Sequence, residues 1–377
     1  MKKIIIFSIA LSVLLITISG TVSADNNTIY YRNAKTIGMG STRIAGGFNY
    51  NGFVDNPALL SRVPLVRFSL FNLPITLNKN LVDIGSFVND NQENFMNFTV
   101  DEFDEFGNRN EDFMTEEEKN VFLKDVEKQD GKWSRVNVSP MVDFAVSFLG
   151  QSIGLAVFNV TDVGIKIDRG IYEPRVWGKG NSSVAAVLGY SRPLTYFVPG
   201  LTVGINLKYM ERRRANLFQI KASDLGNTQE TFDPITEEVK NDKFNTLAMD
   251  IGALYDIPII DSEIGAAIRS IGDGRGASVD IGIAKRMYND NLLLLADYID
   301  LLDMNKENVF NKLHFGAELS AQVIKLRAGL NSGYPTAGLG LNFRVVDIDA
   351  AYFFDELGNA PGKSEDARYV IQFKLGW

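Results

Sequence analysis

Apolar and polar residues alternate along most of the chain after residue 64, in segments of about ten residues. In residues 201–209, leucine, valine, isoleucine and tyrosine fill the odd positions, and threonine, glycine, asparagine and lysine fill the even ones. Side chains of a strand alternate between two faces, so this period predicts β-strands. We predict fourteen of them, at residues 65–77, 134–149, 153–167, 183–190, 201–213, 244–255, 263–270, 278–286, 292–298, 313–320, 323–330, 337–344, 347–354 and 368–377.

The polar face of these segments carries many ionised side chains, which would not line a packed apolar core. They include Lys208, Asp250, Glu263, Arg269, Asp280, Asp297, Glu318, Lys325, Arg327, Asp347 and Asp349. Such a face suits either bulk water, in a soluble β protein, or the wet interior of a transmembrane β-barrel. The period alone leaves both readings open.

The connections between the segments favour the barrel. Long ones (78–133, 168–182, 214–243, 271–277, 299–312, 331–336 and 355–367) alternate with short ones such as 150–152, 287–291 and 321–322. An even-stranded barrel with short turns on one side and long loops on the other requires this order. The first long connection, 78–133, is predicted to be partly helical, because Thr115 and Glu118 form a capping-box pattern.

The last predicted strand is apolar on one parity, at Tyr369, Ile371, Phe373, Leu375 and Trp377. An ordinary amphipathic strand would show the same alternation. A strand that carries its apolar face to a terminal aromatic residue resembles the C-terminal signature of bacterial outer-membrane β-barrels. That resemblance implies two partners, outer-membrane lipid and the outer-membrane barrel-assembly machinery.

Residues 1–24 have the pattern of a secretory signal peptide. Lys2 and Lys3 precede an apolar stretch over residues 4–18, and Val22-Ser23-Ala24 is a small-x-small cleavage site. We expect cleavage after Ala24 and export. The rest of the chain then divides into an N-terminal segment, residues 25–63, and a β-domain, residues 64–377.

Composition limits the chemistry. The chain has 377 residues, no cysteine, one histidine (His314) and a formal net charge of −8. These values exclude thiolate and histidine-rich metal sites and argue against nucleic acid as a partner. No catalytic constellation stands out, since a hydrolase triad would depend on His314. We therefore expect neither an enzyme nor a cofactor or metal.

The N-terminal segment is rich in glycine and asparagine and has no sustained period. Gly38 and Gly40 are too few for a dinucleotide loop, because Arg43 replaces the third glycine and no strand precedes them. This glycine pair, followed by Asn56-Pro57-Ala58-Leu59 before the first strand, resembles the N-terminal hatch of FadL-type transporters of hydrophobic compounds. In a soluble protein the same tetrapeptide would be a loop turned by Asn-Pro. PorV-like barrels of secretion systems carry a similar segment.

The resemblance implies an all-β fold: a single 14-stranded antiparallel transmembrane β-barrel in the outer membrane, with the hatch inside the lumen. It also implies uptake of a hydrophobic ligand, a fatty acid or hydrocarbon, that passes the hatch and leaves sideways through a gap in the wall. Fourteen strands enclose a lumen too wide for side chains alone to fill, which fits a plugging segment. The alternative is a PorV-like role as a partner of secretion proteins.

One position could weaken the barrel wall. If the second and third strands fold on Gly150, Pro140 lies opposite Val160, between Asn159 and Thr161. Proline donates no ladder hydrogen bond, and Asn159 and Thr161 fall on the predicted lipid-facing parity. We predict a seam there. The alternative is that this height, roughly 33 Å from the turn, is already close to the outer membrane interface.

Overall fold

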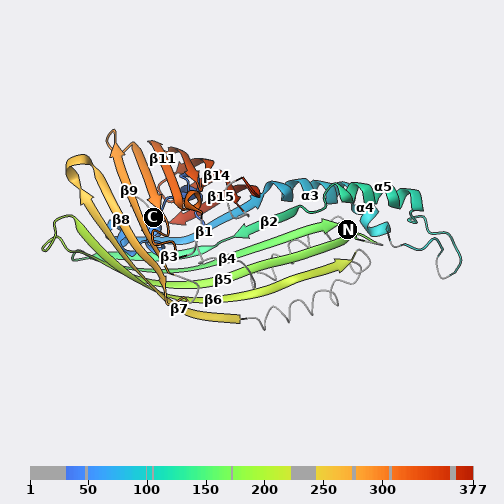
Figure 1. The fold of residues 1–377 in the computed structure, drawn as a ribbon, viewed down its shortest axis with the longest axis horizontal. Coiled ribbons are helices and arrows are strands. Elements are labelled where there is room, and N and C mark those ends of the chain that lie inside the picture. Colours follow the sequence, from blue (N-terminus) through green and yellow to red (C-terminus); the bar gives the residue numbers. More distant parts are fainter. Residues whose placement is uncertain are drawn as a thin grey trace.

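The computed structural model describes residues 31–46, 50–98, 100–103, 106–170, 173–221, 243–273, 277–304, 308–356 and 362–376. The predicted signal peptide and Trp377 lie outside these ranges. Within them the fold is one large antiparallel sheet, a short N-terminal segment and a group of helices after the first strand (Figure 1).

Fifteen strands in the described residues form the sheet, with neighbours in the chain pairing in order. Strand β1 also pairs with β15, from Ser69 opposite Gly376 to Asn78 opposite Arg368, so the sheet closes into a barrel. The strands are β1 (Val66–Asn78), β2 (Trp133–Val138), β3 (Met141–Phe148), β4 (Gln151–Asp168), β5 (Arg175–Pro193), β6 (Leu201–Lys221), β7 (Lys243–Ile257), β8 (Ser262–Ile271), β9 (Ser278–Met287), β10 (Leu292–Tyr298), β11 (Leu313–Ala321), β12 (Ile324–Asn331), β13 (Tyr334–Asn342), β14 (Val346–Glu356) and β15 (Glu365–Gly376).

The barrel has fourteen strand positions, as predicted, because β2 and β3 share one of them. Both pair with β1 on one side and with β4 on the other. They are the two halves of the single predicted strand 134–149, divided at Ser139 and Pro140. The break falls at Pro140, since proline has no amide hydrogen to continue the ladder.

Two strands are longer than the sequence indicates. β5 begins at Arg175 rather than at residue 183, and β6 continues to Lys221 rather than ending at residue 213. The predicted loop 168–182 is therefore mostly strand. Its residues include Gly178, Gly180 and Asn181, so the apolar alternation is absent, but the backbone ladder with β4 runs without interruption from Ser152 to Asp168.

Burial alternates along each strand and defines an inner and an outer face. In β15, Arg368, Val370, Gln372 and Lys374 are buried. The residues between them are exposed on the outside, at 45% for Tyr369, 62% for Ile371, 41% for Phe373 and 37% for Leu375. An apolar exterior and a polar interior are the arrangement of a transmembrane barrel.

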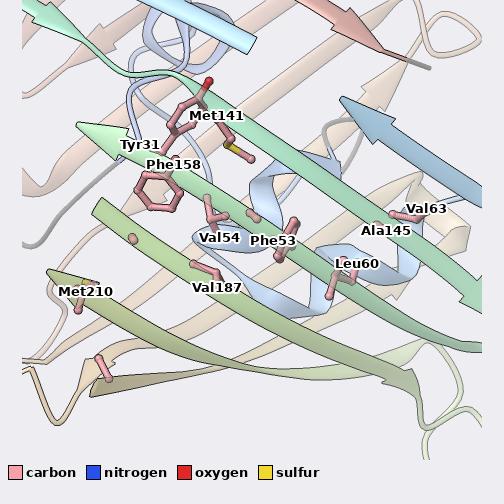
Figure 2. Packing of buried hydrophobic residues seen from close by; sticks show 13 residues of the cluster. Tyr31, Phe53, Val54, Leu60, Val63, Met141, Ala145, Phe158, Val187 and Met210 are labelled. Atoms are coloured by element: carbon pink, nitrogen blue, oxygen red, sulfur yellow. The ribbon is translucent and has the colours of Figure 1, made fainter. Parts of the chain in front are cut away.

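The N-terminal segment, residues 31–63, lies against inner faces of the barrel. It contains α2 (Ala34–Gly38) and the 3-10 turns η2 (Tyr50–Val54) and η3 (Pro57–Arg62). Helix α2 packs on β12–β15, and η3 packs on β3–β7, so opposite parts of the wall hold the two ends of the segment. In Figure 2, Phe53 and Leu60 of the segment lie among buried residues of the wall such as Val187.

The described part of the long connection after β1, predicted to be partly helical, contains three helices. They are α3 (Lys79–Asp90), α4 (Gln92–Asn97) and α5 (Glu116–Glu127), and Figure 1 shows them at one end of the molecule, beyond β8–β14. Their apolar sides enclose Phe95, Phe98 and Phe122, and the cluster extends to Ile167 of β4 and Val176 of β5. Two further short turns are η5 (Pro258–Ile260) and η6 (Val309–Lys312). None of the described helices is long and apolar enough to cross a bilayer.

Candidate functional site

The tetrapeptide Asn56-Pro57-Ala58-Leu59 is buried inside the barrel. The exposed fraction is 0% for Asn56 and Ala58 and 2% for Leu59. Asn56 is the N-cap of η3: its side-chain oxygen accepts from the Ala58 amide at 3.1 Å. Its side-chain nitrogen donates to the Ile44 carbonyl at 2.8 Å and to the Ala253 carbonyl of β7 at 3.3 Å. One amide group thus fixes the turn, the preceding loop and the wall together.

Glycines on the inner face of the wall let the N-terminal backbone come close. A Cβ on Gly204 would lie 2.5 Å from the Pro57 carbonyl carbon, and a Cβ on Gly252 would collide with Asn56. Gly265 faces the Ile44 carbonyl, and Gly329 faces Gly40, in the same way. The wall therefore has a glycine at each of these contacts because no side chain fits between the two backbones.

Gly38 and Gly40 contact the opposite part of the wall from Asn56. Gly40 has a φ of +65°, which favours glycine, and a Cβ there would collide with the Phe315 and Leu330 carbonyls. Its amide donates to the Thr336 hydroxyl at 3.0 Å, and its carbonyl lies 2.9 Å from Nδ1 of His314. His314 is thus a wall residue that contacts the N-terminal segment.

Buried carboxylates of the wall bind backbone amides of the segment. Asp297 of β10 accepts from the Arg43 amide at 2.6 Å and the Ile44 amide at 3.0 Å. Glu263 of β8 accepts from the Gly46 amide at 2.8 Å and also forms an ion pair with Arg62. The ionised side chains that the sequence places on the polar face therefore meet the N-terminal segment as well as one another, and a charged hydrogen bond of this kind contributes roughly 1.5–3 kcal/mol.

An apolar cluster covers part of the inner wall over β3–β7, where buried ionic side chains such as Lys208 and Asp250 also lie. Tyr31 stacks edge-on against Phe158 of β4, with ring centroids 5.6 Å apart. The same cluster includes Met141, Val187, Met210 and Phe53 (Figure 2). This surface was not predicted from the sequence, although Met141, Phe158, Val187 and Met210 are apolar residues on the inward parity of their strands.

A strip of neutral polar side chains borders this apolar cluster on β1. Asn72 lies directly opposite Met141 in the strand ladder and accepts from Gln372 at 2.5 Å. Ser69 and Thr76 lie on the same face and are at most 2% exposed. An apolar and a hydrogen-bonding surface therefore meet inside the barrel at the junction of β1 and β3.

The predicted seam residues lie close together, with one correction to their pairing. Phe148 pairs with Gln151 and Met141 with Phe158, so Pro140 lies opposite Asn159, not Val160. The Asn159 amide donates to the Pro140 carbonyl at 3.0 Å, and the Ser139 amide donates to the Pro74 carbonyl of β1 at 3.1 Å. The ladder is thus reduced rather than absent where β2 ends and β3 begins.

Asn159 and Thr161 take part in a polar cluster on the outer face. The Thr161 hydroxyl donates to Asn159 at 2.5 Å and lies 2.9 Å from the Ser182 hydroxyl, and Asn159 donates to Ser182 at 2.7 Å. Thr161 is 4% exposed. These residues form a site separate from Asn56 and Gly40, since they lie on the other side of the wall.

The described part of the C-terminal strand closes the barrel. Leu73 and Phe71 of β1 lie opposite Phe373 and Leu375, and the Phe71 and Phe373 rings are 6.1 Å apart on the outer face.

Metal-binding groups of three or more histidine or acidic side chains do not occur in the described ranges.

Comparison with known proteins identifies the fold. The toluene transporter TodX of Pseudomonas putida superposes with a TM-score of 0.52 at 11% sequence identity, over 94% of this chain and 99% of TodX. The toluene transporter TbuX of Ralstonia pickettii gives a TM-score of 0.51 at 12% identity, over 90% of this chain and 96% of TbuX. No protein-family model and no curated protein sequence matches the chain. The expected resemblance to the barrels of hydrophobic-compound transporters is confirmed at the level of the fold.

Proposed function

We propose that this protein is an outer-membrane channel for the uptake of hydrophobic small molecules, with the N-terminal segment as its hatch. The observation that supports this most directly is the buried apolar cluster inside the barrel that includes Phe53, Met141, Phe158, Val187 and Met210, because a porin for hydrophilic solutes would have a polar lumen. The structural likeness to two toluene transporters agrees with it. The proposal includes no catalytic step and no cofactor.

The ligand class is a fatty acid or a hydrocarbon. Its apolar body would pack against Tyr31, Met141 and Phe158, which belong to one buried cluster. The same cluster includes Phe53 and Leu60, which belong to the segment together with Tyr31. Ligand would therefore enter by displacing part of the segment, and the wall beside β1 and β3 would remain in place.

The exit in this proposal is the break between β2 and β3. It adjoins the apolar cluster, since Met141 is the first residue of β3. At Ser139 and Pro140 fewer ladder hydrogen bonds hold the wall than elsewhere along β4, so local separation costs less free energy there. A molecule leaving sideways would enter the bilayer without crossing water.

Uptake of radiolabelled fatty acid and toluene in a deletion strain tests the proposal. Cells with the wild-type protein should accumulate label faster than cells without it. Phe158→Asp, which places a charge in the apolar cluster, should reduce uptake at least about tenfold. Asp83→Asn, on external helix α3, is the matched control and should leave it unchanged. Equal uptake with and without the protein would contradict the proposal.

One observation favours a second function, a PorV-like role as a partner in protein secretion. The external loop exposes two aromatic side chains, Phe103 at 55% and Phe106 at 83%. Exposed aromatic residues are frequent at protein interfaces. In this case deletion should abolish export of secreted proteins and leave hydrocarbon uptake unaltered.

The location and the partners are part of the proposal. We expect export through the signal peptide, insertion by the barrel-assembly machinery and contact with outer-membrane lipid. Membrane fractionation checks this: the mature protein should be in the outer-membrane fraction and should migrate differently on gels with and without heating. Recovery in the soluble periplasmic fraction would contradict it.

A further inference from the structure

A groove of about 560 Å³ crosses the outer face of the barrel over β4–β8. Outward side chains form most of its lining, among them Leu155, Leu188, Leu207, Tyr209 and Leu247, with Ala186 as part of its surface, and the inward-facing residues Val187, Lys208 and Ala248 also border it. The flanking leucines are well exposed, at 56% for Leu207 and 72% for Leu247. The groove therefore opens away from the lumen and is separate from the hatch.

The strand register explains the concave shape. Ala186 lies directly opposite Val157 on β4 and Tyr209 on β6, and Tyr209 lies opposite Leu247 on β7. The methyl side chain of Ala186 thus lies between the larger side chains of Val157 and Tyr209. Because directly opposed residues project from the same face, the small side chain leaves a depression that the larger ones border.

Two rows with polar side chains lie directly above this apolar one, toward the end of the barrel that carries α3–α5. The first contains Asn159 and Glu211 with the apolar Val184 between them, and the second contains Thr161, Ser182 and Arg213. Successive rows are two residues, or roughly 7 Å, apart along the strands. The outer face of β4–β6 therefore changes from apolar to polar over the length of one lipid head group.

The polar rows carry both signs of charge. Glu211 and Arg213 form an ion pair at 2.6 Å, and both side chains are partly exposed, at 17% and 28%. Thr161 and Ser182, in the same rows, are each 4% exposed and bond to each other and to Asn159. This pattern complements a head group with a phosphate and an ammonium group more closely than one with a phosphate alone, because Glu211 repels a second anion.

We propose that the groove binds one phospholipid with a zwitterionic phosphoethanolamine head group. One acyl chain lies in the groove between Leu188, Leu207 and Tyr209. Arg213 contacts the phosphate, and Glu211 contacts the ammonium group. This inference rests on the membrane location in the proposed function but not on uptake of any substrate.

Native mass spectrometry of the purified full-length protein tests the site. The protein is incubated separately with phosphatidylethanolamine, phosphatidylglycerol and lipid A of matched acyl length. Wild type should retain one phosphatidylethanolamine, at least about fivefold more than phosphatidylglycerol. Ala186→Leu, which fills the groove, should reduce retention about tenfold, equivalent to 1.4 kcal/mol.

Two further variants keep the test decisive. Ala328→Leu, on the outer face of β12, is the matched control and should retain lipid as wild type does. Glu211→Gln leaves the groove open and should remove the preference over phosphatidylglycerol without removing binding, which a general folding defect would not do. Equal retention in Ala186→Leu and Ala328→Leu, no preference in wild type, or preference for lipid A would each overturn the assignment.

The result is separable from the uptake proposal. Ala186→Leu should transport hydrophobic label at the wild-type rate, since the groove lies outside the lumen. Loss of lipid retention with normal uptake therefore supports the site, and lipid retention without any uptake would leave the site in place and contradict only the channel. A protein absent from the membrane fraction would contradict both.

Discussion

At the scale of single residues, Asn56 joins three parts of the chain through its side-chain amide. Its partners are Ala58, two residues on, Ile44, 12 residues before it, and Ala253, 197 residues away. Asn56→Asp keeps the acceptor for Ala58 but removes both donated hydrogen bonds and buries a charge. We expect the segment to dock less stably by about 2–3 kcal/mol.

Limited proteolysis and amide hydrogen exchange over residues 31–63 measure that loss. Asn89→Asp, an exposed position on α3, is the control and should be neutral. Unchanged protection in Asn56→Asp would show that the amide is not an anchor. The sequence predicts the turn at Asn-Pro, because this signal is local. It does not reveal Ala253 or the facing Gly252, since those contacts depend on how a strand far along the chain is placed.

At the scale of elements, α5 shows how far local signals reach. Thr115 accepts from the Glu118 amide at 3.3 Å, and the Glu118 carboxylate accepts from the Thr115 amide at 2.8 Å, which is the predicted capping box. The side-chain and backbone hydrogen bonds from Thr115 lower the pKa of Glu118 below its usual 4.5. Because the pKa of Glu118 is lower in the folded helix than in the unfolded chain, its ionised carboxylate stabilises the helix at pH values above the unfolded pKa. This stabilisation is lost as the pH falls through the folded pKa.

Thr115→Ala should therefore increase amide exchange over residues 116–127 about fivefold, in line with a cap worth about 1 kcal/mol. In wild type the protection factors over the same residues, taken relative to the intrinsic exchange rate at each pH, should fall as the pH is lowered below about 4.5, and Glu118→Gln should abolish that pH dependence. Glu117→Gln, one position away and outside the capping box, serves as the control. The full length of strands β5 and β6 was less predictable. The part of β5 before residue 183 and the part of β6 after residue 213 pair through the backbone, but their side chains lack the apolar period.

At the scale of the whole molecule, alternating apolar faces and alternating loop lengths are sufficient to predict fourteen strand positions and an antiparallel order. They do not predict what fills the lumen, because inner-face residues obey the same period whether they meet water, ligand or protein. The contacts of Gly204 with Pro57 and of Asp297 with Ile44 decide this, and both join the wall to a segment with no period of its own. Barrel closure, in contrast, was predictable from the last strand.

Closure at β1 and β15 leads to the last prediction. The Phe71 and Phe373 rings meet across this junction, which forms only after both ends of the β-domain are present. Phe373→Ser removes roughly 2 kcal/mol of apolar side-chain contact and burial in lipid. We expect a reduced fraction of heat-modifiable protein in the outer membrane. Leu339→Ser, an equally outward position on β13, is the control, since its strand is paired on both sides by sequence neighbours. If the two variants assemble equally well, the C-terminal strand has no special role in closure.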